Sequence, residues 1–108
     1  MKKFLLSLLA LFMFTCLSVF ADNTKSIKFV QVSDAHFSAD SDYTQKVLKS
    51  AISDINSLQD VSFVVFTGDN VNSPNESNLK AFLKIVKKLK VPYYIAIGDH
   101  DVYKANGL

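Results

Sequence analysis

The sequence has no arginine, a single cysteine, three glycines and two prolines in 108 residues. One cysteine excludes a disulfide-based scaffold, and so few glycines and prolines exclude collagen-like and low-complexity chains. Positive charge comes only from 12 lysines, against 10 aspartates and glutamates. The lysines at positions 2 and 3 account for the whole formal net charge of +2. The rest of the chain is therefore neutral overall, which argues against a nucleic-acid binding patch because phosphate recognition needs a positive surplus.

The first 21 residues have the pattern of a secretory signal peptide. Two lysines precede a nearly unbroken apolar run over residues 4–20, and Val19 and Ala21 are small residues suited to cleavage before Asp22. We therefore expect an exported protein, periplasmic or secreted, with no stable membrane association after cleavage. The alternative is an uncleaved membrane anchor, because the apolar run approaches the roughly 20 residues that span a bilayer. Cleavage would also remove Cys16, the only cysteine.

Residues 22–108 are enough for at most one small domain, and strand and helix patterns alternate along them. Strands are predicted at residues 27–33, 61–67 and 93–97. Residues 43–58 repeat apolar side chains at helical spacing, which predicts an amphipathic helix. The segment 61–67 is apolar without alternation, which is typical of a strand buried on both faces.

A second helix is predicted to begin after Ser73. Ser73 would be the N-cap, with Pro74 at the first helical position and Glu76 completing a capping box. The residues expected to face the core share the spacing of one helix face, and they are Leu79, Phe82, Leu83, Val86 and Leu89. The lysines between residues 84 and 90 lie mainly off this face, so we interpret them as a solvated surface.

The resulting βαβαβ order predicts an α/β fold with a mostly parallel sheet. Each predicted strand ends in a short polar cluster: residues 34–36, 68–70 and 98–101. Open α/β sheets bind ligands beyond the carboxyl ends of their strands, so these clusters should share one edge. The candidate site residues are Asp34, His36, Asp69, Asp99, His100 and Asp101. A flavodoxin-like or nucleotide-binding sheet would explain the topology but not the two histidines.

Carboxylates and imidazoles without thiolates suit divalent or trivalent ions of Zn, Mn or Fe. The set contains more ligands than one ion needs, and a two-metal centre with a bridging carboxylate would use the excess. Two ions about 3.5–4 Å apart can activate a water molecule and hold a phosphoryl group. Bound cations would also relieve the repulsion among so many carboxylates.

These segments resemble the D-x-H … G-D … G-N-H-[DE] signature of calcineurin-like metallophosphoesterases. Residues 34–36, 68–69 and 98–101 carry the match. The resemblance implies a two-sheet sandwich flanked by helices, of which this chain would supply the βαβαβ half. It also implies hydrolysis of a small-molecule phosphoester, phosphodiester or phosphomonoester, through two metal ions. The pattern is closer to bacterial cyclic-nucleotide and glycerophosphodiester phosphodiesterases than to purple acid phosphatases, which carry Gly in place of His36.

The resemblance also assigns a role to each site residue. The implied metal ligands are Asp34 and His36 on the first ion, Asp69 as the bridge, and Asp99 on the second ion. The family has Asn at the last of these positions, so the ligand oxygen is kept but becomes anionic. His100 would stabilise the transition state or protonate the leaving oxygen, and Asp101 would orient the ring of His100.

One departure from the family concerns length. The family signature continues with further histidines on later strands, and this sequence has none after His100. We therefore interpret residues 22–108 as the N-terminal, truncated part of a metallophosphoesterase domain, with one sheet face left uncovered and with no activity expected of this portion alone. The alternative is a non-catalytic metal-binding or structural α/β remnant.

Overall fold

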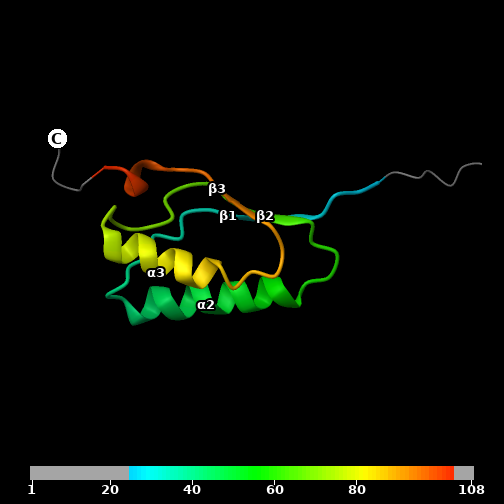
Figure 1. Ribbon diagram of the computed structural model, residues 1–108, viewed down its shortest axis with the longest axis horizontal. Helices are drawn as coiled ribbons and strands as arrows, with labels where there is room; N and C mark the ends of the chain where they lie inside the picture. Colours follow the sequence, from blue (N-terminus) through cyan, green and yellow to red (C-terminus); the bar gives the residue numbers. More distant parts are fainter. Residues whose placement is uncertain (1–24, 104–108) are drawn as a thin grey trace, which may run out of the picture.

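The computed structural model describes residues 25–103 (Figure 1). The predicted signal peptide, residues 1–21, and its cleavage position lie outside the described residues. Neither of the helices between residues 25 and 103 combines the length and the apolar character that crossing a membrane requires.

Three parallel strands form one sheet in the order β1-β2-β3. The strands are β1 (Phe29–Val32), β2 (Phe63–Phe66) and β3 (Tyr93–Ile95). Helix α2 (Asp42–Ser57) connects the first two, α3 (Glu76–Val86) connects the second and third, and a short 3-10 turn, η1 (Asp99–Asp101), follows β3. Both helices lie on the same side of the sheet (Figure 1). The predicted α/β fold and its βαβαβ order are thus confirmed.

The start of α3 differs from the predicted one. The N-cap is Asn75, whose side chain accepts a hydrogen bond from the backbone N of Asn78, and the helix begins at Glu76. Asparagine caps helices as well as serine does. The carbonyl of Ser73 instead accepts hydrogen bonds from the Asn75 backbone N and the Asn78 side chain. The predicted N-cap and capping box at Ser73 are therefore wrong, and the helix begins two residues later than predicted.

The core lies between the helices and the sheet. Helix α2 buries Leu48, Ile52 and Ile55, three residues of its predicted apolar face. Helix α3 is rotated relative to the prediction, because it buries Ile85 while Leu79 and Leu83 are each 37% exposed. In the core, the buried ring of Phe82 packs against the buried rings of Phe37 and Phe66.

The prediction that residues 61–67 are buried on both faces is only half correct. Val64 and Phe66 are fully buried beneath the helices, whereas the alternate residues of β2 are half-buried on the other face. There Phe63 stacks on Phe29 at 5.2 Å between ring centroids and meets Tyr94 edge-on at 5.8 Å. Phe29 and Tyr94 are largely exposed, so an uncovered row of aromatic rings crosses all three strands.

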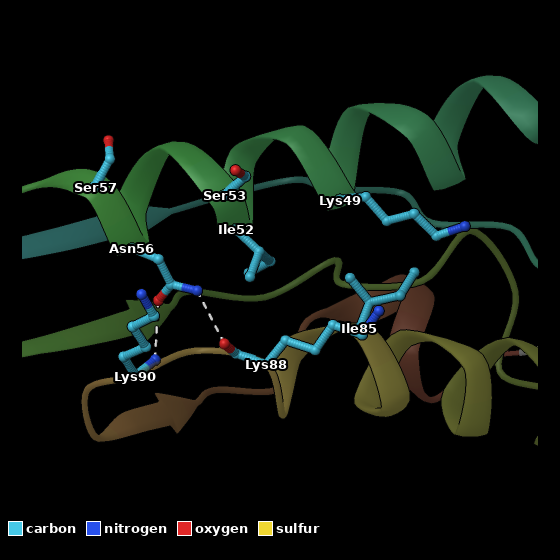
Figure 2. A pocket seen from close by; sticks show the side chains of 8 residues that line it. All are labelled: Lys49, Ile52, Ser53, Asn56, Ser57, Ile85, Lys88 and Lys90. Atoms are coloured by element: carbon cyan, nitrogen blue, oxygen red, sulfur yellow. Dashed lines mark hydrogen bonds between the residues drawn. The ribbon is translucent and has the colours of Figure 1, made fainter.

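Asn56 joins the end of α2 to the segment that leads from α3 to β3. Its Nδ2 donates to the Lys88 carbonyl and its Oδ1 accepts from the Lys90 backbone N, both at 2.9 Å (Figure 2). An open groove of about 430 Å³ runs beside this contact, with Ile52 and Ile85 in its lining. The lysines between residues 84 and 90 are all exposed, which confirms the predicted solvated surface. The contact fixes where β3 begins relative to α2.

Candidate metal site

The segments that follow β1 and β2 run side by side beyond the ends of their strands. The backbone N of Asp34 donates to the carbonyl of Gly68, and that of His36 donates to the carbonyl of Asp69, at 3.2 and 2.9 Å. The pairing continues at the next residue, where the backbone N of Phe37 donates to the carbonyl of Asn70. The buried side chain of Phe37 anchors this pairing to the core, so the first two polar clusters are held at one edge as predicted.

Three site residues have left-handed backbone conformations. The φ angles of Asp34, His36 and Asp69 are 54°, 40° and 51°. Aspartate and histidine occupy this region more often than most residues, but it still costs about 1–3 kcal/mol per position. The hydrogen bonds between the two segments offset this cost. These left-handed residues lie in the loops after β1 and β2, where the side chains of Asp34, His36 and Asp69 come together.

Two glycines let the third segment approach the second. Gly68 has a φ of 116°, and a Cβ at this position would lie 3.1 Å from the Cα of Gly98. A Cβ on Gly98 would overlap the backbone N and the Oδ1 of Asp69. Only a residue without a side chain fits between these backbones, so Gly98 sets how closely the turn after β3 lies against Asp69.

Asp34, His36 and Asp69 form the cluster best suited to a metal ion among residues 25–103. Each offers one ligand atom, and the three atoms lie within 4.8 Å of one another. His36 Nε2 is 3.8 Å from Asp34 Oδ1 and 4.0 Å from Asp69 Oδ2. Two ligands that each lie about 2.1 Å from one ion can be at most about 4.2 Å apart, so both pairs fit a shared ion. The donor set of two carboxylates and an imidazole also suits such an ion.

Hydrogen bonds already orient two of these carboxylates. The Ser33 hydroxyl donates to Oδ2 of Asp34, and the backbone N of His100 donates to Oδ1 of Asp69 at 3.0 Å. The remaining oxygen of Asp69, Oδ2, is the one that lies toward His36. Partners of this kind fix the orientation of metal ligands before an ion binds.

His100 lies beside the cluster. Its ring meets the ring of His36 edge-on, with centroids 4.6 Å apart. Nδ1 of His100 is 3.1 Å from the carbonyl oxygen of Asn72. A carbonyl can only accept, so this contact places the Nδ1 proton on His100 and leaves Nε2 as the free ring nitrogen. His100 can therefore present Nε2 to a bound molecule, as its assigned role requires.

Asp101 hydrogen-bonds its neighbours and not the ring of His100 in the described residues, so any orienting of that ring by Asp101 would be indirect and stays a prediction. Its carboxylate accepts hydrogen bonds from the backbone N of Val71 and of Gly98, both at 2.9 Å, and from Asn70 Nδ2 at 2.8 Å. Burial acts to raise the pKa of Asp101, but these hydrogen bonds outweigh it and lower the pKa below its ordinary value. The carboxylate therefore stays ionised and joins the turn after β3 to the segment after β2.

Asp99 stands apart from the other candidate ligands. It is exposed at the start of η1, and its carbonyl accepts hydrogen bonds from the backbone N of Val102 and of Tyr103. Among the described residues, its carboxylate is outside the cluster of Asp34, His36 and Asp69. The structure thus brings His100 to the first three predicted ligands, and Asp99 remains a predicted ligand on the adjoining turn.

Two asparagines were absent from the predicted site. Asn70 is buried and donates to both Asp101 and the Ala96 carbonyl, and Asn72 supplies the carbonyl that holds the His100 ring. Their positions were the only sequence signal: Asn70 belongs to the predicted polar cluster 68–70, and Asn72 lies two residues beyond it.

A sequence model of calcineurin-like phosphoesterases matches residues 27–108, which include every element of this fold and every site residue. The chain belongs to the calcineurin-like phosphoesterase family. The resemblance drawn from the three strand-end motifs is thereby confirmed.

One curated calcineurin-like relative is a probable glycerophosphodiester phosphodiesterase, GpdQ, of Arcobacter nitrofigilis. It is 35% identical over 79 residues, which cover 67% of this chain and 29% of the relative. The chain thus spans under a third of the length of that protein. The similarity agrees with the predicted closeness to glycerophosphodiester phosphodiesterases.

Proposed function

We propose that the protein carrying this chain is a metal-dependent phosphoester hydrolase that acts on small-molecule phosphodiesters. The observation that carries the proposal is the convergence of Asp34, His36 and Asp69 beside His100 at one sheet edge. Family membership and the phosphodiesterase named among its relatives favour phosphoester substrates. A glycerophosphodiester is the first substrate to test because it is the one in the relative's name.

Two divalent or trivalent ions, of Fe, Mn or Zn, are part of this proposal. Asp34 and His36 would hold one ion, Asp99 would hold the other, and Asp69 would serve both. When bound, such ions supply a water molecule of lowered pKa and positive charge for the phosphoryl oxygens. The donor types of the cluster, and the distances from His36 Nε2 to each of the two carboxylates, support this assignment of the first ion.

His100 acts on the substrate in this proposal. Because Nδ1 donates to Asn72, Nε2 faces away from that contact. In the imidazolium form, which carries a proton on both nitrogens, Nε2 can donate to a phosphoryl oxygen or give its proton to the leaving oxygen, which leaves the ring neutral with its proton on Nδ1. The Asp69 carboxylate is fixed by the backbone N of the same residue. The proton donor and the metal ligand are therefore positioned by one short turn.

Removal of metal tests the proposal directly. The intact protein should hydrolyse bis(p-nitrophenyl) phosphate and a glycerophosphodiester, lose both activities after dialysis against a chelator, and recover them with Mn²⁺, Fe²⁺ or Zn²⁺. Activity that survives in protein shown to be metal-free would disprove the role of metal. Protein that binds metal stoichiometrically but hydrolyses neither substrate would support the non-catalytic alternative.

We also propose that residues 1–21 are cleaved and that the mature protein is exported. Cleavage after Ala21 is favoured by small residues at the −3 and −1 positions. N-terminal sequencing of the protein from the extracytoplasmic fraction should read Asp-Asn-Thr-Lys. Recovery of an intact N-terminus in the membrane fraction would instead identify an uncleaved anchor.

A further inference from the structure

Asn70 occupies an unusual place for a buried amide. It follows Asp69 directly, and its side chain is only 4% exposed. Nδ2 uses both of its protons, donating to the Ala96 carbonyl at 2.9 Å and to Asp101 Oδ2 at 2.8 Å. Both acceptors belong to the segment that leaves β3, so one side chain from the second strand end holds the third.

The Asp101 carboxylate extends this contact into a network. The same Oδ2 accepts from the backbone N of Gly98, and Oδ1 accepts from the backbone N of Val71. The turn is thus fixed at both of its ends, at Gly98 and at Asp101. His100 lies between these two anchored residues.

The network determines where His100 lies relative to Asp69 and Asn72. The backbone N of His100 reaches Oδ1 of Asp69, and Nδ1 reaches the Asn72 carbonyl, only while the turn stays against residues 69–72. A displacement of the turn would break both contacts together. A misplacement of about 1 Å is enough to reduce turnover by about 10²-fold.

We propose that Asn70 is a positioning residue, which acts through Asp101 to hold the ring of His100 against the substrate. The inference rests on the proposed hydrolysis and on the role given to His100 there. Asn70 touches no substrate and no metal in this proposal. Its effect should therefore be expressed in turnover and only in reactions that need His100.

The chain offers a matched control in Asn78. This asparagine is also buried, at 3% exposed, and its side chain also makes two hydrogen bonds, accepting from the Ala39 backbone N and donating to the Ser73 carbonyl. Its side-chain partners lie in the connections that precede the helices and not in residues 98–101. Asn78→Ala should therefore destabilise the fold as Asn70→Ala does, without displacing His100.

The test compares Asn70→Ala, Asn78→Ala, His100→Ala and the double variant Asn70→Ala/His100→Ala in the intact protein. Because a displaced turn also loses the contact of the His100 backbone N with Asp69, all variants are assayed at saturating metal. Under these conditions Asn70→Ala should lower kcat on an alkyl phosphodiester by about 10–100-fold with unchanged KM. The double variant should be no slower than His100→Ala. The ring nitrogen signals of His100 in ¹⁵N spectra should change in Asn70→Ala and stay unchanged in Asn78→Ala.

Independent losses that multiply in the double variant would overturn the proposal, as would an equal loss of turnover in Asn78→Ala. If Asn70→Ala does not fold, Asn70→Asp replaces it in the test. Aspartate has the same shape as asparagine, but it lacks both N–H donors and places a second carboxylate next to that of Asp101. Full turnover in Asn70→Asp would also overturn the proposal. If His100→Ala alone leaves turnover intact, the catalytic role of His100 fails. The ¹⁵N spectra then still decide whether Asn70 positions the ring.

Discussion

Asp69→Asn should lower the metal content of the intact protein from about two ions toward one or none and abolish hydrolysis. Oδ1 of Asp69 accepts from the backbone N of His100, while Oδ2 lies 4.0 Å from His36 Nε2 in the proposed site. An asparagine has one oxygen for these two tasks. If that oxygen keeps the His100 contact, the amide NH₂ faces the ion; if it binds the ion, two donors face each other. Either arrangement also loses the negative charge.

Metal analysis and kinetics on the same preparations measure this effect. Asp60→Asn is a suitable control, since Asp60 also has a left-handed backbone, with a φ of 61°, but is exposed and outside the cluster. The control should keep its metal and its activity, because asparagine tolerates the same backbone region. Full metal content in Asp69→Asn would show that Asp69 does not bridge the ions.

The sequence predicted where the site would be because its location depends on topology. Parallel strands joined by helices bring their carboxyl ends to one edge, so the polar clusters after each strand had to meet there. Asp34, His36 and Asp69 meet in this way, and His100 joins them. The three strands and two helices were also predictable, because apolar spacing sets them locally.

The contacts of Asp101 could not be predicted in the same way. Asp101 and His100 are adjacent, which suggested that one would orient the other. The ring contact comes instead from Asn72, and the carboxylate contacts Asn70 and Val71, about 30 positions away in sequence. Such partners are set by how closely two loops approach, and here Gly98 determines that distance. No local pattern carries this information.

Side-chain packing explains why α3 is rotated relative to its prediction. Helix α3 turns Ile85 inward because Phe82 fits between Phe37 and Phe66, and this rotation moves Leu79 and Leu83 outward. Apolar spacing alone could not determine whether the face with Ile85 or the face with Leu79 and Leu83 is buried, since both faces carry apolar residues at helical spacing.

His100→Ala should separate catalysis from metal binding. The His100 side chain contacts the Asn72 carbonyl and the His36 ring, whereas Asp69 is held by the His100 backbone N, which alanine retains. The variant should therefore keep its metal content. Turnover of an alkyl phosphodiester should fall by about 10²–10⁴-fold, as for the loss of a general acid.

A comparison of two leaving groups shows whether His100 donates a proton or stabilises charge. An alkoxide needs a proton as it departs, whereas a nitrophenolate is a weak base and departs without one. His100→Ala should thus slow an alkyl phosphodiester far more than bis(p-nitrophenyl) phosphate. Equal losses on both substrates would instead assign His100 to stabilising charge on the phosphoryl oxygens. Loss of metal from His100→Ala, as from Asp69→Asn, would contradict the assignment of His100 to the substrate, because it would show that the ring supports metal binding, directly or through its contact with His36.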